Sequence, residues 1–299
     1  MMPALDEKSL RGELLFNEPL SGHTTWRVGG PARRFYRPAD SADLVRFLQQ
    51  LETDEPLLWL GLGSNLLVRD GGFPGTVIAT QGRLNRLEWR DGTRLYAEAG
   101  VSCAKVARTA ARAGLCGAEF LVGIPGTLGG ALAMNAGAFG GEIWDQVKQV
   151  ETLDRYGEVR KRSPDDFDIG YRSVKGTAGE WFLSAELQLQ SGDVSASQQV
   201  IRTLLDRRAA AQPTSLPSCG SVFRNPTGKH AAKLIEAAGL KGTRVGGAQV
   251  SEKHANFIIN TGDATAADIE ALITKVQSEV EQHSGVLLVP EVHRVGEAR

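Results

Sequence analysis

Two glycine-rich stretches decide the fold of this chain, and the first of them, residues 57–68, reads LLWLGLGSNLLV. The apolar run 57–60 predicts a buried strand that ends in the loop Gly61–Asn65. A G-x-G-x-x-G turn would need a third glycine where this chain has Leu66, and a helix after it. A second strand is expected instead, so an anion at this loop would be met by successive backbone N–H groups alone. The pattern also fits a glycine-rich hairpin without a ligand.

The second stretch, residues 123–140, reads GIPGTLGGALAMNAGAFG. It is dense in glycine and alanine but apolar, whereas a flexible linker would be polar. Small residues on an apolar backbone suit a flat ring pressed against the main chain, with N–H groups meeting its heteroatoms. Close helix packing over small residues is the alternative interpretation of this stretch.

The elements around these stretches indicate an α+β fold. Helices are expected at 101–113, 195–211 and 264–283, and strands at 147–153, 181–189 and 286–289. They do not alternate regularly, which favours α+β over a doubly wound parallel sheet. A chain of 299 residues is long enough for two domains. The boundary is expected at 191–193, giving domains 1–193 and 194–299, with the first split into subdomains of about 1–62 and 63–193.

Composition excludes several classes of protein. Hydrophobic residues make up 41% and charged residues 23%, and the net charge is −1, so no basic field for nucleic acid or a membrane surface is present. No apolar run approaches the roughly 20 residues of a membrane span. Charges scattered through Met1–Leu20 argue against a signal peptide, and a cytoplasmic location is expected. The three cysteines form no C-x-x-C pair, and no cluster has the spacing of metal ligands.

Three polar residues stand out as catalytic candidates. Arg172 lies in the loop motif GYRS, and an arginine offers a planar fork that grips a carboxylate. Ser221 lies in SCGSVFRNP, which is not a G-x-S-x-G hydrolase elbow, but a hydroxyl held near a carbanion can protonate it. Glu291 follows the apolar run 286–289 and Pro290. Each of the three also fits a plain structural role, as a surface arginine, a turn serine and a strand-end glutamate.

The order of these motifs resembles that of the UDP-N-acetylenolpyruvoylglucosamine reductase (MurB) family. The matching segments include HTTWRVGGPA at 23–32, GLGSNLL at 61–67 and GIPG at 123–126, and the resemblance extends from about His23 to His293. It implies the FAD-binding fold shared with vanillyl-alcohol oxidase, in which two subdomains clamp FAD, followed by an α+β substrate domain. It also implies that NADPH reduces FAD, and that UDP-N-acetylenolpyruvoylglucosamine is then reduced to UDP-N-acetylmuramate, a peptidoglycan precursor.

The resemblance assigns roles to individual residues. Arg172 matches the active-site arginine, Ser221 the donor of a proton to C2 after hydride transfer from flavin N5 to C3, and Glu291 the last catalytic residue. The expected FAD contacts are Gly61, Gly63, Ser64, Asn65, Ile124, Pro125, Gly126, Gly129, Gly130, Asn135 and Gly137. The expected substrate contacts are Tyr171, Asn225, Gln249 and His254. No metal and no protein partner are indicated.

Only residues 174–180 separate Ser173 from the next expected strand. That is too short for the tyrosine-bearing loop of one class of the family, so the chain resembles the second class. Two other interpretations stay open: a different oxidoreductase of the same flavin fold, and a non-enzymatic binder of nucleotide sugars. The first should lack the Ser221 and Glu291 motifs, and the second would give a colourless protein.

Overall fold

The computed structural model describes residues 6–299 and divides into two compact units. Unit 1 comprises the residues up to Leu15, Arg34–Leu62 and Gly75–Asp206, and unit 2 comprises Phe16–Arg33, Gly63–Pro74 and Arg207–Arg299. The first five residues of the segment Met1–Leu20, for which no signal peptide was expected, lie outside the described range. From residue 6 to the C-terminus, no helix has the length and apolarity needed to span a membrane.

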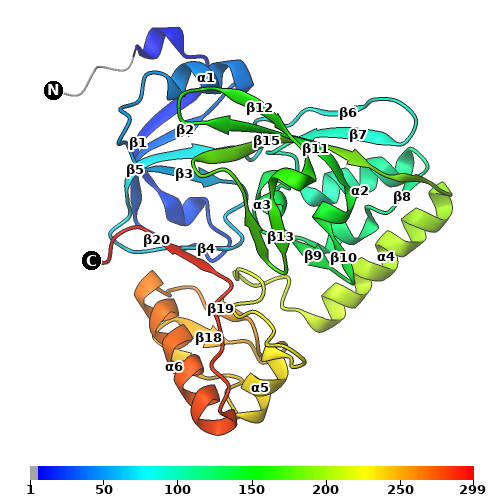
Figure 1. The fold of residues 1–299 in the computed structure, drawn as a ribbon. Coiled ribbons are helices and arrows are strands. Elements are labelled where there is room, and N and C mark those ends of the chain that lie inside the picture. The colour runs from blue at the N-terminus through cyan, green and yellow to red at the C-terminus, as the bar shows by residue number, and fades with distance from the viewer. Residues whose placement is uncertain (1–5) are drawn as a thin grey trace. The chain divides into compact units, whose positions relative to one another are not determined.

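Unit 1 contains an antiparallel sheet of five strands in the order β12-β11-β15-β7-β6. Its strands are β6 (Leu87–Trp89), β7 (Arg94–Glu98), β11 (Val147–Asp154), β12 (Val159–Arg162) and β15 (Glu180–Gln188). Helix α3 (Leu128–Ala133) packs against β15 and β7, and α2 (Cys103–Arg112) lies nearby in the same core (Figure 1). The second glycine stretch therefore contains a short packed helix, as the alternative interpretation of its small residues expected.

Three short pairs of strands and helix α1 (Ser41–Leu48) also belong to this part of the chain. The short pairs are β8 (Leu115–Cys116) with β16 (Gln190–Ser191), β9 (Gly137–Ala138) with β10 (Gly141–Glu142), and β13 (Asp168–Gly170) with β14 (Ser173–Lys175). Helix α1 begins after Asp40, whose side chain accepts a hydrogen bond from the Asp43 amide and so caps the helix. In α2 the Ser102 side chain accepts from the Lys105 amide in the same way.

A second sheet has the strand order β1-β2-β5-β3, with β3 and β5 parallel. Its strands are β1 (Glu13–Pro19), β2 (Pro31–Arg37), β3 (Leu57–Leu60) and β5 (Phe73–Ala79). The expected strand before the first glycine loop is thus confirmed as β3, and the loop runs into β4 (Leu66–Val68) rather than a helix. Helix α4 (Val194–Ala211) matches the helix expected at 195–211.

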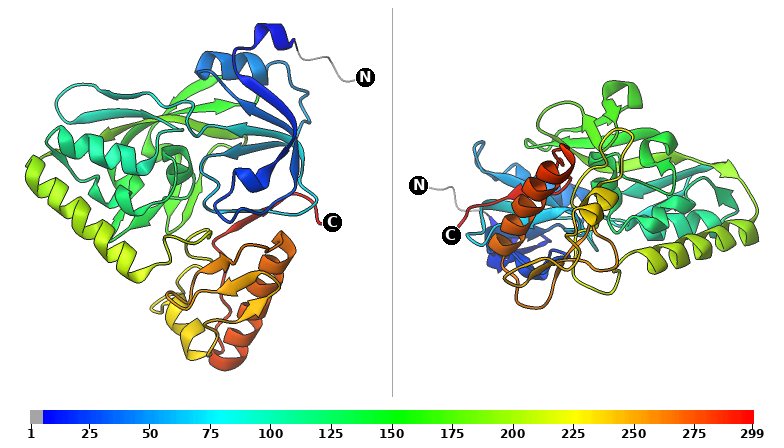
Figure 2. Two further views of the ribbon diagram at one scale, coloured as in Figure 1. Left: turned by 180° about the vertical axis from the view of Figure 1, so that it is seen from behind. Right: turned by 90° about the horizontal axis from the view of Figure 1, so that it is seen from below.

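Unit 2 has its own hydrophobic core under α6 (Ala266–Ser284). Helix α6 packs on the antiparallel strands β17 (Arg244–Val245) and β18 (Ala248–Val250), and the sheet ends with β19 (Ile258–Asn260). Helix α5 (Ala231–Ala237) lies beside α6 (Figure 2). The final strand β20 (His293–Val295) pairs in parallel with β4, so the residues after the first glycine loop belong to the same unit as the C-terminus.

The strand expected at 286–289 is wrong. The segment has no regular strand partner, and only Pro290 forms an isolated bridge, with Phe223. Leu287 and Val289 are 57% and 54% exposed, whereas Leu288 is fully buried. Of the residues in this apolar run, only Leu288 is buried. No neighbouring strand within residues 6–299 covers the run, which is joined to the Ser221 segment only by isolated backbone contacts.

Candidate functional site

The glycines of the first loop stand where a side chain would collide with the backbone or a buried neighbour. A Cβ on Gly61 would press on Thr127 Oγ1, at less than 3.0 Å, in unit 1. Gly63 has φ of +66°, and a Cβ there would lie 2.9 Å from Thr24 Cα in unit 2. Thr25 N donates to Gly63 O at 3.2 Å. The loop is thus held in one conformation that only glycine permits at these two positions.

The second glycine stretch is fixed by main-chain bonds to the residues that follow β7. Leu128 N donates to Val101 O at 2.8 Å and Gly129 N to Ala99 O at 2.9 Å, and a Cβ on Gly129 would lie 2.8 Å from Ala99 Cβ. The Gly129 amide is therefore already used inside the protein. A Cβ on Gly130, by contrast, would meet nothing closer than Thr127 Oγ1, at 3.7 Å. Gly130 thus has open space beside it, as a wall residue of a ligand site should.

A cavity of about 370 Å³ in unit 1 brings parts of the two glycine stretches together. Gly61, Thr127, Gly129 and Gly130 line it. Its aromatic wall includes Trp59 and Trp181, whose rings stack with centroids 5.2 Å apart. The volume lies within the range of small-molecule sites, and a floor of small residues beside flat rings suits a planar ligand. Thr127 was not singled out in the sequence, and its hydroxyl is buried with no hydrogen-bond partner among the described residues.

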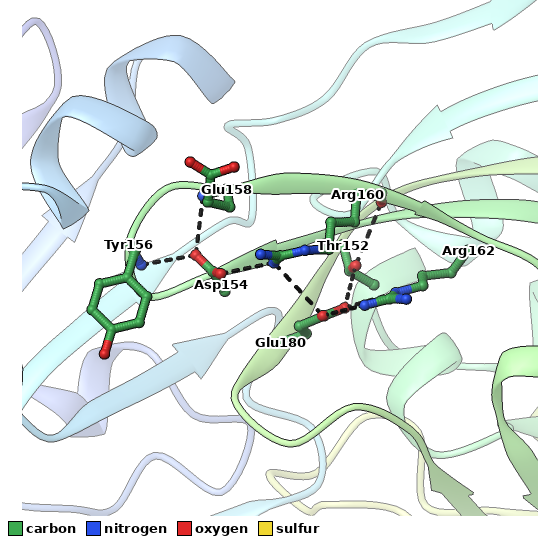
Figure 3. A network of polar contacts seen from close by, with 7 residues as sticks. All are labelled: Thr152, Asp154, Tyr156, Glu158, Arg160, Arg162 and Glu180. Carbon is green, nitrogen blue, oxygen red and sulfur yellow. Dashed lines mark hydrogen bonds and ion pairs between the residues drawn. The ribbon is translucent and has the colours of Figure 1, made fainter.

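One wall of this cavity is a carboxylate neutralised by arginines. Glu180 lines the cavity and accepts two bonds from Arg162, at 3.1 and 2.5 Å, and one from Thr152 Oγ1 at 2.6 Å (Figure 3). Arg160 lies 3.7 Å from Glu180 and 2.7 Å from Asp154. The hydrogen bonds from Arg162 lower the pKa of Glu180 below its usual 4.5. The wall is therefore charged at neutral pH but internally compensated.

Arg172 occupies the tip of the hairpin β13–β14, with Gly170 paired to Ser173 on either side. Its φ of +53° is a left-handed conformation that non-glycine residues rarely adopt. Nη2 donates to Gly137 O at 2.9 Å, and Nη1 lies 3.4 Å from Asn135 O. Tyr171, half exposed, lies under the guanidinium, with the ring centroid 5.4 Å from Cζ. The guanidinium plane is thus fixed from two sides.

Asn135 is the second strained residue of this cluster, with φ of +43°. Its side-chain nitrogen donates to Glu142 Oε2 at 2.7 Å and to Gly170 O at 3.2 Å, and its oxygen accepts from Trp144 N at 3.4 Å. Two left-handed non-glycine residues that hold each other are costly, and such strain clusters at functional sites. The structure therefore brings together Asn135, Gly137 and Arg172, all three of which the sequence named.

In unit 2 the Ser221 segment runs beside the Glu291 segment. Glu291 N donates to Val222 O at 2.7 Å, Phe223 bridges to Pro290, and Arg224 N donates to Val289 O at 2.9 Å. The structure therefore places Ser221 and Glu291, 70 positions apart in the chain, on adjacent backbone segments. Arg172 belongs to unit 1.

Asn256, which sequence reasoning missed, clamps the Ser221 segment from its other side. Its Oδ1 accepts from Phe223 N at 3.0 Å, its Nδ2 donates to Phe223 O at 2.8 Å, and its own carbonyl accepts from Val222 N at 2.9 Å. It is 4% exposed. The only sequence signal was its place in the motif VSEKHAN, beside His254. Cys219 is also buried here, and burial raises the pKa of its thiol.

The candidate substrate residues of unit 2 have mixed surroundings. Asn225 Oδ1 accepts from Ala231 N at 3.0 Å, so it caps the start of α5. Gln249 Oε1 accepts from Arg244 Nη2 at 2.9 Å. His254 packs edge-on against Phe257, and its buried Nδ1 meets no hydrogen-bond partner within residues 6–299. Burial lowers the pKa of His254 below 6.5, so the ring is neutral at pH 7.

Ser64 and Asn65 lie at the end of the first loop, within unit 2. Asn65 Nδ2 donates to the main-chain oxygen of Glu291 at 3.2 Å, and Asn65 O accepts from His293 N at 3.1 Å. Among residues 6–299, no three His, Cys, Asp or Glu side chains are grouped so that they could hold a metal ion.

Comparison with known proteins identifies the class first. Residues 32–163 match the family model of an FAD binding domain, and residues 212–295 match that of the UDP-N-acetylenolpyruvoylglucosamine reductase C-terminal domain. The chain is therefore a flavoprotein, and the expected α+β FAD-binding fold is confirmed. It belongs to the UDP-N-acetylenolpyruvoylglucosamine reductase (MurB) family.

The relatives match along the whole chain. The reductase of Alkalilimnicola ehrlichii is 62% identical over 298 residues, covering 100% of both chains. That of Methylococcus capsulatus is 62% identical over 289 residues, covering 97% of this chain and 95% of its own. Among solved structures, UDP-N-acetylenolpyruvylglucosamine reductase from Thermus caldophilus superposes with a TM-score of 0.82 at 34% identity, covering 95% of this chain and 99% of its own.

Proposed function

We propose that this flavoenzyme uses NADPH to reduce UDP-N-acetylenolpyruvoylglucosamine to UDP-N-acetylmuramate, a step of peptidoglycan synthesis. The observation that carries the residue assignment is the pairing of the Ser221 and Glu291 segments through Glu291 N and Val222 O, at 2.7 Å. The proposed proton donor and the proposed charge-stabilising carboxyl are thereby held on adjacent, hydrogen-bonded segments. The alternative of a non-enzymatic binder gives no reason for this pairing.

The glycine cradles fit FAD. Gly61, Gly63, Ser64 and Asn65 would hold the pyrophosphate, since glycine is required at the first two and the loop offers backbone N–H groups. The cavity beside Gly130 and the fixed main chain at Asn135 and Gly137 would take the rest of the cofactor, together with Ile124, Pro125, Gly126 and Gly129. Bound FAD would supply the redox chemistry that carries hydride from NADPH to C3 of the enolpyruvyl group.

Arg172 would bind the carboxylate of the enolpyruvyl group. Reduction at C3 places negative charge on C2 and the carboxylate, and a guanidinium whose plane is already fixed stabilises that charge without reorganising. The bonds from Arg172 to Gly137 O and Asn135 O supply this fixation. Its strained backbone is consistent with selection for position rather than for stability.

Ser221 would then protonate C2, and Glu291, in its protonated form, would help to stabilise the charge that develops on the carboxylate. A serine hydroxyl has a poor pKa for proton transfer, so its position must be well defined. Asn256 and Glu291 hold the residues next to Ser221 from both sides, which supplies that definition.

Four further residues would bind the substrate: Tyr171, Asn225, Gln249 and His254. The neutral ring of His254 is suited to hydrogen bonding with sugar or phosphate oxygens, and its apolar surroundings keep it neutral. Residues 1–193, with subdomains of about 1–62 and 63–193, would serve FAD, and residues 194–299 the substrate. The loop between β14 and β15 spans only 176–179, which supports the second class of the family. We also propose a cytoplasmic location.

The test is a stopped-flow comparison of Ser221→Ala with wild type. The variant should be reduced by NADPH at the wild-type rate but should lose reoxidation by the enolpyruvyl substrate. Ser218→Ala, in the same motif and bridged to Ile259, is the matched control and should behave as wild type. Normal reoxidation of the Ser221 variant would remove the serine from the mechanism.

A further inference from the structure

The side chain of Asn65 links the cofactor loop to the backbone of Glu291. Its Nδ2 donates to Glu291 O at 3.2 Å, although the two residues are 226 positions apart. We propose that Asn65 is a positioning residue that orients Glu291, so that the FAD loop and the catalytic carboxyl move as one body. This inference rests on the proposed role of Glu291.

Both peptide groups of Glu291 are fixed by neighbours in unit 2. Its N–H donates to Val222 O at 2.7 Å, on the Ser221 segment, and its carbonyl accepts from Asn65. The first bond restrains the backbone before Cα and the second restrains it after Cα. The origin and direction of the glutamate side chain are therefore set jointly by the Ser221 segment and by the cofactor loop.

Main-chain pairing continues from this point. His293 N donates to Asn65 O at 3.1 Å, and β20 then pairs with β4 from Leu66 opposite His293 to Val68 opposite Val295. Asn65 thus holds the chain on both sides of Val292, once through its side chain and once through its main chain. The pairing of β4 with β20 does not extend back to Glu291, so the hydrogen bond from the Asn65 side chain connects Glu291 to the loop.

The far end of β4 is anchored to α6, which makes the cofactor loop a firm support. Both oxygens of Asp70 accept from the first amides of α6, Ala266 N and Ala267 N, at 3.0 Å each. Arg69 makes a bidentate pair with Glu270, at 2.8 and 3.3 Å to Oε1 and 3.1 Å to Oε2. A loop fixed in this way can transmit its position to Glu291 through Asn65.

This arrangement gives Asn65 a task other than a pyrophosphate contact. An apolar or acceptor side chain at position 65 would leave the loop backbone in place, because the His293 bond uses the main chain. It would remove the hydrogen bond that Asn65 Nδ2 donates to the carbonyl of Glu291. Since misplacing a catalytic group by about 1 Å can cost about 100-fold in rate, we expect reoxidation to slow by about 10- to 100-fold.

The experiment measures both half-reactions by stopped flow, with the FAD dissociation constant, for Asn65→Ala and Asn65→Asp. Asp keeps the size of the side chain but lacks the N–H donor at neutral pH. Both variants are saturated with FAD, and at saturation both should be reduced by NADPH within about 3-fold of the wild-type rate. In both variants, kcat for reoxidation by the enolpyruvyl substrate should fall, whereas the KM for that substrate should stay nearly unchanged. The control Gln282→Ala removes an exposed α6 side chain that bonds, among residues 6–299, only to Ser278, and it should leave both half-reactions unchanged.

A double-mutant cycle with Glu291→Gln decides whether Asn65 acts through Glu291. If it does, Asn65→Ala should add little to the loss in Glu291→Gln. If the rate losses of the two single variants instead multiply in the double variant, the positioning role is overturned. It is also overturned if the Asn65 variants release FAD but reoxidise normally once they are saturated with it. Normal reoxidation by Glu291→Gln alone would instead refute the proposed function of Glu291, so the two failures are distinguishable.

Discussion

Gly61→Ala should weaken FAD binding through a steric collision that a second substitution removes. The added Cβ would lie within 3.0 Å of Thr127 Oγ1 and 3.3 Å from both Thr127 Cβ and Cγ2. Thr127 is 2% exposed, so its side chain has little room to rotate away. The collision lies in the wall of the cavity that is proposed to take part of the cofactor.

The size of the effect follows from the overlap. Ordinary contact begins at 3.4 Å, so the two atoms must separate by more than 0.4 Å (3.4 − 3.0). Overpacking of this kind typically costs about 1–3 kcal/mol. Expressed entirely in cofactor binding, this is a loss of affinity by a factor between about 5 and 150.

The assay is titration of FAD with apoprotein, followed by quenching of flavin fluorescence. Thr127→Ala in the Gly61→Ala background should restore affinity, and it breaks no hydrogen bond, because Thr127 Oγ1 has no partner in the described part of the chain. Thr127→Val, which puts a methyl group in place of the hydroxyl, should not restore it. Wild-type affinity in Gly61→Ala, or rescue by valine as well as by alanine, would refute the reasoning.

Three further predictions follow from single contacts. Asp70→Ala should destabilise the protein by about 1–2 kcal/mol, because α6 loses an acidic cap with two accepted bonds; an unchanged urea midpoint would contradict this. Glu180→Gln should be less stable than wild type above pH 4.5, since the lowered pKa of Glu180 stabilises the fold only while the group is ionised. That difference in unfolding free energy should vanish as the pH falls below the lowered pKa. Urea unfolding of both proteins at pH 7 and pH 3 measures it. An equal difference at the two pH values would show that the ion pairs of Glu180 do not stabilise the fold. Arg172→Lys keeps the charge but loses the planar fork, so stopped-flow reoxidation should slow by about 100-fold with Tm nearly unchanged; a near-normal rate would exclude bidentate binding.

Local sequence signals predicted α2, α4 and α6 to within two residues at each end, and they predicted a strand rather than a helix after the first glycine loop. Asp40 and Ser102 begin their helices as capping residues, and α6 ends at Gly285, which has a φ of +67°. These outcomes depend on neighbours within four residues, which the sequence displays directly. The absence of a third glycine after Gly63 likewise excluded a Rossmann turn, and β4 follows the loop.

The motif order predicted the family, but not how its residues are held. Arg172 was named from its motif, yet nothing in the motif indicated its left-handed backbone or its bonds to Gly137 and Asn135. Asn256 and Thr127 carried no signal of their own. Asn256 matters because it hydrogen-bonds to the backbone of Phe223, and Thr127 matters because it lines the cavity beside Gly61.

The sequence by itself determined most of the element types, the glycine-dependent turns and the identity of the family, because each depends on short-range stereochemistry or on motifs in order. Tertiary structure alone decided that Gly63–Pro74 belongs with Arg207–Arg299, that Leu287 and Val289 lie exposed, and that Asn65 reaches Glu291. The last contact joins residues 226 positions apart, and no local preference encodes such a pairing. Only the folded chain, which pairs β4 with β20, brings the cofactor loop to the carboxyl that it is proposed to orient.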